Sequence, residues 1–283
     1  MCVLMMVKTV IVTSEKDLAS MNIREKLLMI CEWEGSNLTF DGDKILRCEN
    51  QKDLFLVKIK NDVIYSDYLN QLPLKDVTRI IFASRHSSET KKPSLHVHFT
   101  GNWGDANPYG GKPRSLSIAE PIAAKKALLK LVERHVEIRD EKFSVSLEVT
   151  HHGPTEIDYP MLFVELGSSE SQWKNEKAAE ILAEIILEIA NEPIKQVDVA
   201  IGFGGPHYAP AFTKLTLEHD IYMSHMVPKY FIDEFNTEML NKMIKRSSIR
   251  PKIAALDWKG MNSKQRKKIQ DLLDQTDLEK MKI

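Results

Sequence analysis

Residues 143–155 read FSVSLEVTHHGPT, and this stretch carries the strongest fold signal in the chain. Apolar and polar side chains alternate before the histidines, which is the pattern of a β-strand with one buried face. Two histidines follow, and Gly153-Pro154 then ends the extended run. Because neighbouring side chains on a strand point to opposite faces, only one of His151 and His152 can enter a common pocket unless the chain turns there.

Similar apolar runs recur along the chain and are separated by helical patterns. The strands are predicted at residues 8–14, 54–60, 63–69, 77–86, 94–101, 143–150, 161–167, 196–203 and 252–258. The helices are predicted at residues 16–31, 117–135, 171–190, 235–247 and 262–274, with Ser117 and Glu120 forming a capping box. Residues 54–60 and 63–69 are expected to pair through a turn at Asn61-Asp62. Strands separated by helices of this length favour an α/β fold with a mostly parallel, mixed sheet.

Length and composition indicate an ordinary globular protein. The 283 residues are 43% apolar and 28% charged, which suits a single domain over residues 1–283 with a sizeable core. Residues 1–90 could form an N-terminal lobe of that domain. No apolar run approaches the ~18 residues of a membrane span, so no membrane partner is expected. The apolar opening segment is interpreted as a buried first strand rather than a signal peptide.

The cysteine pattern indicates a reducing compartment. The chain has three cysteines, Cys2, Cys31 and Cys48, and their odd number and spacing fit neither a disulfide framework nor a zinc knuckle. We therefore expect free thiols and a cytoplasmic location.

Positive charge is concentrated near the C-terminus although the net charge is only −1. Residues 240–270 contain Lys242, Lys245, Arg246, Arg250, Lys252, Lys259, Lys264, Arg266, Lys267 and Lys268, against Asp257 alone. The stretch could be a solvated helix face, which is the commoner meaning of such a run. It could also be an electrostatic footprint for phosphates.

Several other strand ends carry side chains suited to hydrolytic chemistry. Glu165 stands within the apolar run MLFVELG, where a carboxylate must be paired, protonated or bound to metal. His96 and His98 are two residues apart and share a strand face, so they could ligate one metal ion or simply pack in the core. His207 follows a glycine-rich turn whose backbone N–H groups could serve as oxyanion donors. Neither a dinucleotide fingerprint nor a nucleophile elbow is present.

Five motifs in a fixed order resemble the archaeal and plant type of D-aminoacyl-tRNA deacylase, which is unrelated to the bacterial type. They are HFTGNWG (98–104), GGKPRSLS (110–117), EVTHHGPT (148–155), FVELGSS with Trp173 (163–173) and GFGGPHYAP with Thr213 (202–213). Pro206 departs from the pattern, since glycine is expected there; it stiffens the loop but leaves His207 in place.

The resemblance implies a three-layer α/β/α sandwich similar to nucleoside phosphorylases and peptidyl-tRNA hydrolase. It also implies zinc-dependent hydrolysis of the ester that joins a D-amino acid to tRNA, with L-forms spared. Two rival hypotheses remain open: a metal-dependent amidohydrolase or peptidase acting on small substrates, and a non-catalytic RNA-binding module. The basic segment argues against the first rival, and the histidines with an inward glutamate argue against the second.

The residues themselves suggest the following roles. Catalysis is assigned to His151, His152, His207 and Glu165. Substrate contacts are assigned to His98, Asn102, Trp103, Gly153, Pro154, Gly204 and Gly205. Zinc ligands are sought among His151, His152, Glu148 and Glu165. Contacts to tRNA are assigned to Lys242, Lys245, Arg246, Lys264, Arg266, Lys267 and Lys268. The protein is expected to be a monomer or a weak dimer.

Overall fold

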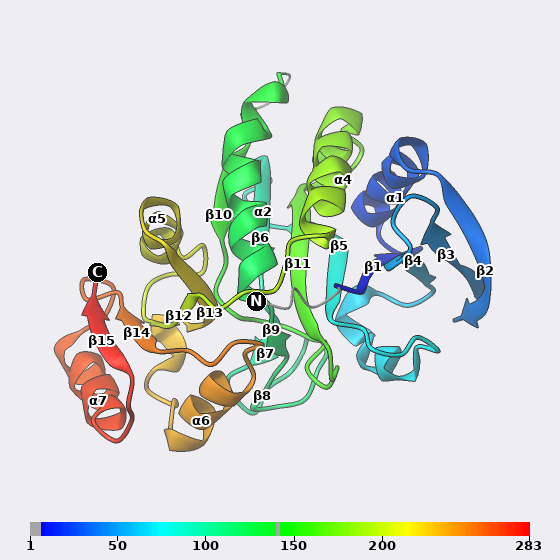
Figure 1. Ribbon diagram of the computed structural model, residues 1–283. Helices are drawn as coiled ribbons and strands as arrows, with labels where there is room; N and C mark the ends of the chain where they lie inside the picture. The colour runs from blue at the N-terminus through cyan, green and yellow to red at the C-terminus, as the bar shows by residue number, and fades with distance from the viewer. Residues whose placement is uncertain (1–6, 140–141) are drawn as a thin grey trace.

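The computed structural model describes residues 7–139 and 142–283 and places their strands in two main sheets (Figure 1). The larger sheet has the order β10-β6-β11-β5-β1-β4-β3-β2, with β9 beside β11. Its strands are β1 (Thr9–Ser14), β2 (Trp33–Phe40), β3 (Asp43–Cys48), β4 (Leu54–Ile59), β5 (Arg79–Ser87), β6 (Ser94–His98), β9 (Ile118–Ala119), β10 (Ser144–Leu147) and β11 (Pro160–Ser168). The smaller sheet contains β12 (Asp198–Phe203), β13 (Ile221–Val227), β14 (Ile253–Leu256) and β15 (Glu279–Lys282). A short ribbon pairs β7 (Gly101–Asn102) with β8 (Ser115–Leu116).

The helices connect and cover these sheets. The α-helices are α1 (Leu18–Ile30), α2 (Pro121–Arg134), α3 (Glu170–Trp173), α4 (Glu176–Ala190), α5 (Pro210–Glu218), α6 (Thr237–Lys245) and α7 (Ser263–Leu273). Short 3-10 helices are η1 (Val63–Tyr65), η2 (Asp67–Gln71), η3 (His135–Glu137) and η4 (Lys229–Phe231). Within the described residues, no helix is both long and apolar enough to cross a membrane.

Most neighbouring strands run parallel, which confirms the predicted α/β class and mixed sheet. Strands β4, β1, β5 and β11 are parallel to one another, and β6 pairs antiparallel with β11. Strands β2 and β3 add an antiparallel hairpin at the far edge, which the sequence patterns did not predict. The smaller sheet is parallel throughout. Parallel strands place their carboxyl ends along a common edge, where loops can form a site.

Helices α1, α2 and α4 cover one face of the larger sheet with apolar side chains. One buried cluster joins their inward faces to Ile81 of β5, Leu95 of β6 and Leu162 of β11. The same cluster continues to Ala200 and Met226 of the smaller sheet. The two sheets therefore share one hydrophobic core, and α6 and α7 cover the outer face of the smaller sheet through a second cluster.

Residues 63–69 were predicted to be a strand paired with β4, and this is wrong. They form η1 and η2, and Val63 and Leu69 pack on the face of the larger sheet opposite the α-helices. Strand β4 already pairs with β1 on one side and β3 on the other, so it has no free edge for another strand. The apolar residues are buried on a sheet face instead of in the plane of the sheet.

The capping box predicted at Ser117 is also wrong, because the N-cap of α2 lies three residues later. Glu120 is the N-cap and accepts a hydrogen bond from the backbone of Ala123, and Pro121 opens the helix. Proline at the first helical position has a fixed φ and lacks only a donor that the helix would not use. The Ser117 hydroxyl instead donates to the carbonyl of Thr100.

The expectation of free thiols is contradicted for two of the three cysteines. Cys31 and Cys48 are joined by a disulfide. The unpredicted hairpin of β2 and β3 explains the pairing, since it places Trp33, just after α1, opposite Cys48. Cys2 lies outside the described residues.

A buried ion pair ties three elements of the core together. The Arg79 guanidinium lies 2.7 Å from the Glu120 carboxylate, and both side chains are almost inaccessible to water. The same guanidinium donates to the carbonyls of Ile189 and Ala190 at the end of α4. Arg79 thus places positive charge at one helix C-terminus, while Glu120 places negative charge at another helix N-terminus.

Replacing Arg79 by methionine should lower the free energy of unfolding by about 3–5 kcal/mol, because the Glu120 carboxylate would stay buried without a partner. Chemical denaturation monitored by circular dichroism would measure the change. The double variant R79M/E120Q should recover part of the loss, since glutamine keeps the cap acceptor without the charge. A loss below about 1 kcal/mol for R79M would show that the pair is not a core constraint.

Candidate active site

Three neighbouring strands supply the first part of the site. Strands β5 and β11 run parallel to each other, and β6 runs antiparallel to β11. Strand β5 ends near His86, β6 carries His96 and His98, and β11 carries Glu165. The register places Glu165 opposite His96 on one side and Ser84 on the other. His86, His96 and His98 contribute imidazoles, and Glu165 contributes a carboxylate.

Two loops complete a group that we call the histidine cluster. Glu148, His151 and His152 follow β10, and His207 follows β12. Strand-like hydrogen bonds hold the loops together, since the Val149 N–H donates to the carbonyl of His207. The histidine cluster consists of His86, His96, His98, His151, His152 and His207 with Glu148 and Glu165. The structure therefore brings together His98, His151, His152, Glu165 and His207, as the sequence predicted.

Both carboxylates of the cluster are buried among imidazoles. One oxygen of Glu165 accepts a hydrogen bond from the Ser84 hydroxyl at 2.8 Å and lies 3.4 Å from Nε2 of His98. The other oxygen lies 3.5 Å from Nδ1 of His86. Burial opposes ionisation of Glu165, but the adjacent His98 and His86 hold its pKa well below its usual range. We therefore regard Glu165 as an ionised group inside the fold.

Glu148 occupies the centre of the cluster and has no exposed surface. Its Oε1 atom lies 3.1 Å from Nε2 of His207 and 3.4 Å from Nδ1 of His86. Burial would raise the pKa of Glu148, whereas the charges of His96 and its neighbours lower it. Neither carboxylate oxygen makes a hydrogen bond of good geometry. A buried carboxylate with both oxygens unsatisfied indicates that a further group belongs beside it.

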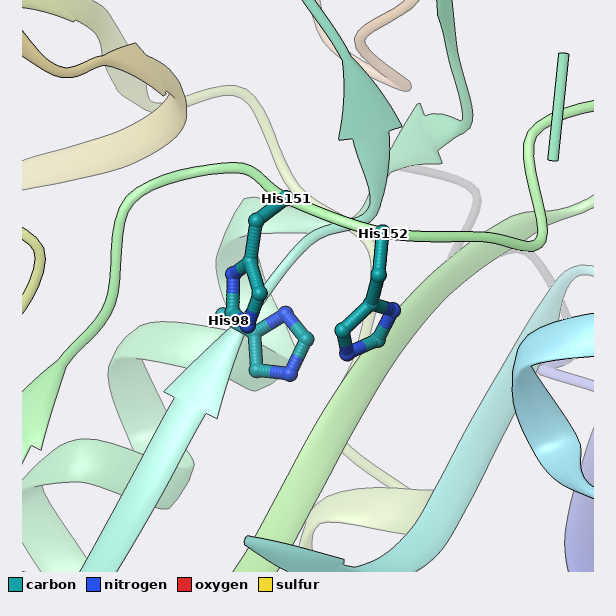
Figure 2. Close-up of side chains that lie close together, drawn as sticks. All are labelled: His98, His151 and His152. Carbon is teal, nitrogen blue, oxygen red and sulfur yellow. The ribbon is translucent and has the colours of Figure 1, made fainter. Parts of the chain in front are cut away.

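His98, His151 and His152 point toward one another (Figure 2). The ring centroids of His98 lie 4.3 Å from those of His151 and 4.9 Å from those of His152. Both loop histidines reach the cluster because His152 has a φ of 43°, in the left-handed region. The chain does turn between them, which is the condition the sequence set for both rings to enter one pocket.

Backbone carbonyls fix the ring orientation of both loop histidines. Nδ1 of His151 lies 2.7 Å from the Val149 carbonyl, and Nδ1 of His152 lies 2.6 Å from the Gly153 carbonyl. Each Nδ1–H must therefore donate, which leaves Nε2 as a lone-pair acceptor in the neutral ring. Loss of hydration, reinforced by the charge of His98, lowers the pKa of His151 well below its ordinary value and that of His152 to about 4.

The sequence did not single out His86, which lies between the two carboxylates. Burial opposes its protonation, but the hydrogen bond to Glu165 and the charge of Glu148 raise its pKa on balance. The signal that was overlooked is its position, because His86 ends an apolar strand in the same way as the other cluster residues. Asp17 was missed as well, and burial raises its pKa to about 6.

The described residues contain overlapping sets of three ligands that could hold one metal ion. The sets are His98, His151 and His152; His86, His96 and Glu148; Glu148, His151 and His207; and His98, Glu148 and Glu165. Within each set the ligand atoms lie within 4.8 Å of one another. Imidazole and carboxylate donors are those that zinc accepts in hydrolytic sites. The unsatisfied oxygens of Glu148 agree with such an ion, as does the Nε2 atom of His98, which lies near Glu165 without a hydrogen bond of good geometry.

An open cleft of about 390 Å³ leads to this cluster. It is lined by His86, His151, His152, Glu165 and His207, together with residues of η1, Asp17, Asp62, Arg85, Ser87 and Tyr109. Glu148 and His98 lie behind these residues and have no exposed surface. The cleft is deep enough to place a small substrate against the imidazoles.

Four residues assigned to substrate binding have other roles in the structure. The Trp103 indole is buried and donates to the Thr150 carbonyl, and the Asn102 amide donates to the Gly110 carbonyl. Gly204 uses its N–H for the carbonyl of Val227, so it is not a free oxyanion donor. Gly204 and Gly205 have positive φ values of 101° and 77° because they form a turn against Asp257 and Met261. These residues position the site from behind and do not line the cleft.

Gly153 stays next to the cluster and is closely enclosed. A Cβ atom there would lie 2.3 Å from the backbone nitrogen of Gly111 and 2.5 Å from the carbonyl oxygen of Ile64. The Gly153-Pro154 peptide bond is cis. Only glycine therefore fits where the loop that carries the two histidines passes between Ile64 of η1 and the backbone of Gly110 and Gly111.

The basic residues assigned to tRNA differ in exposure and in whether their side chains already make hydrogen bonds within the fold. Arg246 donates to the carbonyls of Leu116, Thr155 and Ile157, so it holds the fold. Arg266 donates to the backbone carbonyl of Trp258 and lies over the indole ring. Lys242 donates to the backbone carbonyl of Arg114, and Lys268 donates to that of Asp233. Lys245, Lys264 and Lys267 are exposed, and the last two line a cavity of about 800 Å³ between α6 and α7.

Comparison with known proteins gives a consistent assignment. A family model described as D-aminoacyl-tRNA deacylase matches residues 74–281. The chain is 43% identical over 278 residues to the D-aminoacyl-tRNA deacylase of Pyrococcus furiosus, covering 96% of this chain and 99% of that protein. It is 42% identical over 276 residues to that of Thermococcus kodakarensis, covering 95% and 98%. A crystal structure titled as a conserved protein of unknown function matches with a TM-score of 0.87 and 32% identity, covering 98% of this chain and 95% of that one. The chain therefore belongs to the D-aminoacyl-tRNA deacylase family.

Proposed function

We propose that the histidine cluster hydrolyses the ester bond between a D-amino acid and the 3′-terminal ribose of tRNA, releasing both. The observation that carries the proposal is the set of imidazoles packed around two buried carboxylates beneath an open cleft. An aminoacyl ester is already activated, so hydrolysis needs a positioned water, a base and stabilisation of the carbonyl oxygen. Membership of the deacylase family supports this choice of substrate.

His152 is the best placed general base. Its Nδ1–H donates to the Gly153 carbonyl, which leaves Nε2 to accept a proton. His152 also lines the cleft, where the attacking water and the ester would meet. In this mechanism Nε2 takes the proton of the water and later returns it to the ribose oxygen that leaves.

Glu165 acts as a positioning residue in this scheme. Its two oxygens lie beside His98 and His86, and the Ser84 hydroxyl fixes the carboxylate itself. A carboxylate held in this way orients neighbouring imidazoles and favours positive charge on them. Removing it would take away one of the contacts that orient His98 and His86.

We further propose that zinc binds to Glu148, His151 and His207. These three combine two imidazoles with one carboxylate, a ligand set found in catalytic zinc sites, and their ligand atoms lie within 4.8 Å of one another. Zinc, when bound, lowers the pKa of a coordinated water and polarises an ester carbonyl. The Val149 carbonyl, which accepts from Nδ1 of His151, would fix the orientation of that ligand.

Stereochemical selection should come from backbone close to the cluster. The two enantiomers carry the same groups, so a rigid wall must reject one of them while fixed points hold the ester and the α-amino group. Gly153-Pro154 can form such a wall, because it adjoins His152 and is enclosed by the backbone of Gly111 and Ile64. We also propose that the protein works in the cytoplasm as a monomer or weak dimer.

The purified protein should hydrolyse D-Tyr-tRNA and other D-aminoacyl-tRNAs, and it should spare the L-forms by at least ~100-fold, or about 2.7 kcal/mol. Release of labelled amino acid from matched D- and L-Tyr-tRNA would measure this ratio. The H152A variant should lose at least ~100-fold in kcat, because it lacks the base. Comparable turnover of both enantiomers would move the assignment to a general esterase.

Purified protein should contain about one zinc equivalent, and chelation should abolish activity. Elemental analysis of H207A and E148Q should show loss of the ion, because each removes a proposed ligand. H152A is the matched control and should retain zinc while losing activity. Full activity of metal-free protein would reject zinc but leave the deacylase proposal intact.

Reversing charge at Lys264 and Lys267 should weaken tRNA binding and reduce its salt dependence by about one unit of log–log slope per lost phosphate contact. Fluorescence anisotropy with labelled tRNA over a salt series would measure both. The pair K174E/K177E reverses two exposed lysines, one just after α3 and one on α4, and serves as the control. Equal affinity of both double variants and wild type would identify the basic run as a solvated helix face.

A further inference from the structure

A second, larger cavity of about 630 Å³ adjoins the histidine cluster. It lies between α5 and the first residues of β6 and β10, and its walls include Val145, Leu217 and Pro210. Ser144 and Ser146 add hydroxyl groups along one side. The exposed atoms of its walls are mainly apolar, although many of the lining side chains also carry hydrogen-bonding groups, and this combination suits a small-molecule site. The proposed hydrolysis of the ester does not use it.

Aromatic rings form the wall that this cavity shares with the catalytic cleft. His86 lines the cleft, whereas His96 and Tyr208 line the second cavity. The His86 Nε2 atom lies 3.3 Å from the Tyr208 hydroxyl, and its ring centroid lies 4.4 Å from that of His96. Two consecutive residues, His207 and Tyr208, thus face the two recesses. A substrate held at the wall would extend into both.

The two recesses differ in charge. The cleft is lined by the carboxylates of Asp17, Asp62 and Glu165, and its one arginine, Arg85, already pairs with Asp62 at 2.6 Å. The second cavity is lined by two lysines, Lys92 and Lys214, and one carboxylate, Glu218. Lys214 is 72% exposed, and its ion pair with Glu218 is long at 3.9 Å, so its ammonium can serve another partner. An aminoacyl ester carries an ammonium on one side of the scissile bond and phosphate on the other, which matches this division.

The second cavity also offers a platform for a base. The Tyr208 ring is 40% exposed and stacks on His96 at 5.2 Å with an interplanar angle of 26°. Pro206 and Pro210 flank it without mobile side chains. Aromatic rings in contact with apolar walls bind nucleobases by stacking, and that contribution is largely independent of sequence.

We propose that this cavity binds the 3′-terminal adenosine of the tRNA, with its phosphate beside Lys92 and Lys214 and the aminoacyl group in the cleft. The inference rests on the proposed function, since it names the recess for one half of the same substrate. It places the ribose ester at the wall formed by His86, His96 and Tyr208. The exposed α6 and α7 lysines would then contact more distant parts of the tRNA.

Adenosine 5′-phosphate is the probe, because it carries the base, the ribose and the phosphate but no aminoacyl ester. Wild-type protein should bind it, as measured by isothermal titration calorimetry or chemical-shift changes. Ser144→Trp places an indole in the cavity from an exposed strand position and should weaken binding at least ~10-fold. Ser248→Trp, at an exposed position outside both recesses, should bind like wild type.

Charge reversal tests the orientation of the bound nucleotide. K214E should weaken binding of adenosine 5′-phosphate more than binding of adenosine, whereas K177E on α4 should change neither. In kinetics, S144W should lower kcat/KM for D-Tyr-tRNA at least ~10-fold more than for D-tyrosine methyl ester, which has no adenosine.

Failure of this inference is distinguishable from failure of the proposed function. Absence of nucleotide binding to wild type, or equal binding by S144W, overturns the adenosine site even if the protein deacylates D-Tyr-tRNA. Equal losses on D-Tyr-tRNA and the methyl ester also overturn it and assign the cavity to the aminoacyl group. Nucleotide binding that S144W abolishes supports the site even where no deacylation is detected.

Discussion

Burial of two ionised carboxylates is the constraint on which the rest of the site depends. Glu148 and Glu165 lie inside the fold with almost no contact with water, where an isolated negative charge would be very unfavourable. Their only compensation among the described residues comes from surrounding imidazoles and the Ser84 hydroxyl. The histidines therefore stabilise the charge of the carboxylates, and the carboxylates in turn orient the histidines. Loss of either kind of group would change the charge state of the other.

This requirement explains why the site uses residues from so many elements. One imidazole comes from β5, two from β6, two from the loop after β10 and one from the loop after β12. The backbone bonds from Val149 to His207 and from Thr150 to Met226 join the two sheets at this point. His225 reinforces the junction from behind, since its ring bonds the Thr150 hydroxyl and the carbonyls of Ser117 and Arg246. The loop that carries His151 and His152 is thus part of the contact between the sheets.

The sequence identified polar residues at the ends of apolar strands. It did not show which of the candidate residues are buried and bonded within the fold. His151, His152, His207, His98 and Glu165 could be found because polar chemistry interrupts apolar runs, and the structure brings them together. The same rule applied to the strand at 77–86 would have found His86.

Local patterns could not distinguish residues that line a cleft from residues that satisfy one another inside it. Trp103, Asn102 and Gly204 carry the right chemical groups, but backbone carbonyls already use their donors. The segment 63–69 has a strand-like composition, but it could pair as a strand only if β4 had a free edge, and β4 has none. Whether a strand is already paired on both sides depends on the topology of the whole sheet, as does the division of strands between two sheets. Neither can be predicted from the sequence of one segment. The roles of individual residues in catalysis and in tRNA binding stay predictions.

His152 has an unfavourable backbone conformation that the surrounding fold maintains. A non-glycine residue with φ of 43° is strained by about 1–3 kcal/mol and persists only where its surroundings determine it. Here the surroundings are the enclosed Gly153, whose neighbours leave no room for a Cβ atom, and the Gly153 carbonyl that accepts from the histidine ring. An extended backbone at this position would turn one of the two imidazoles away from the cluster. The strained backbone is therefore what allows two consecutive histidines to line one cleft, and their placement depends on a single tightly packed turn.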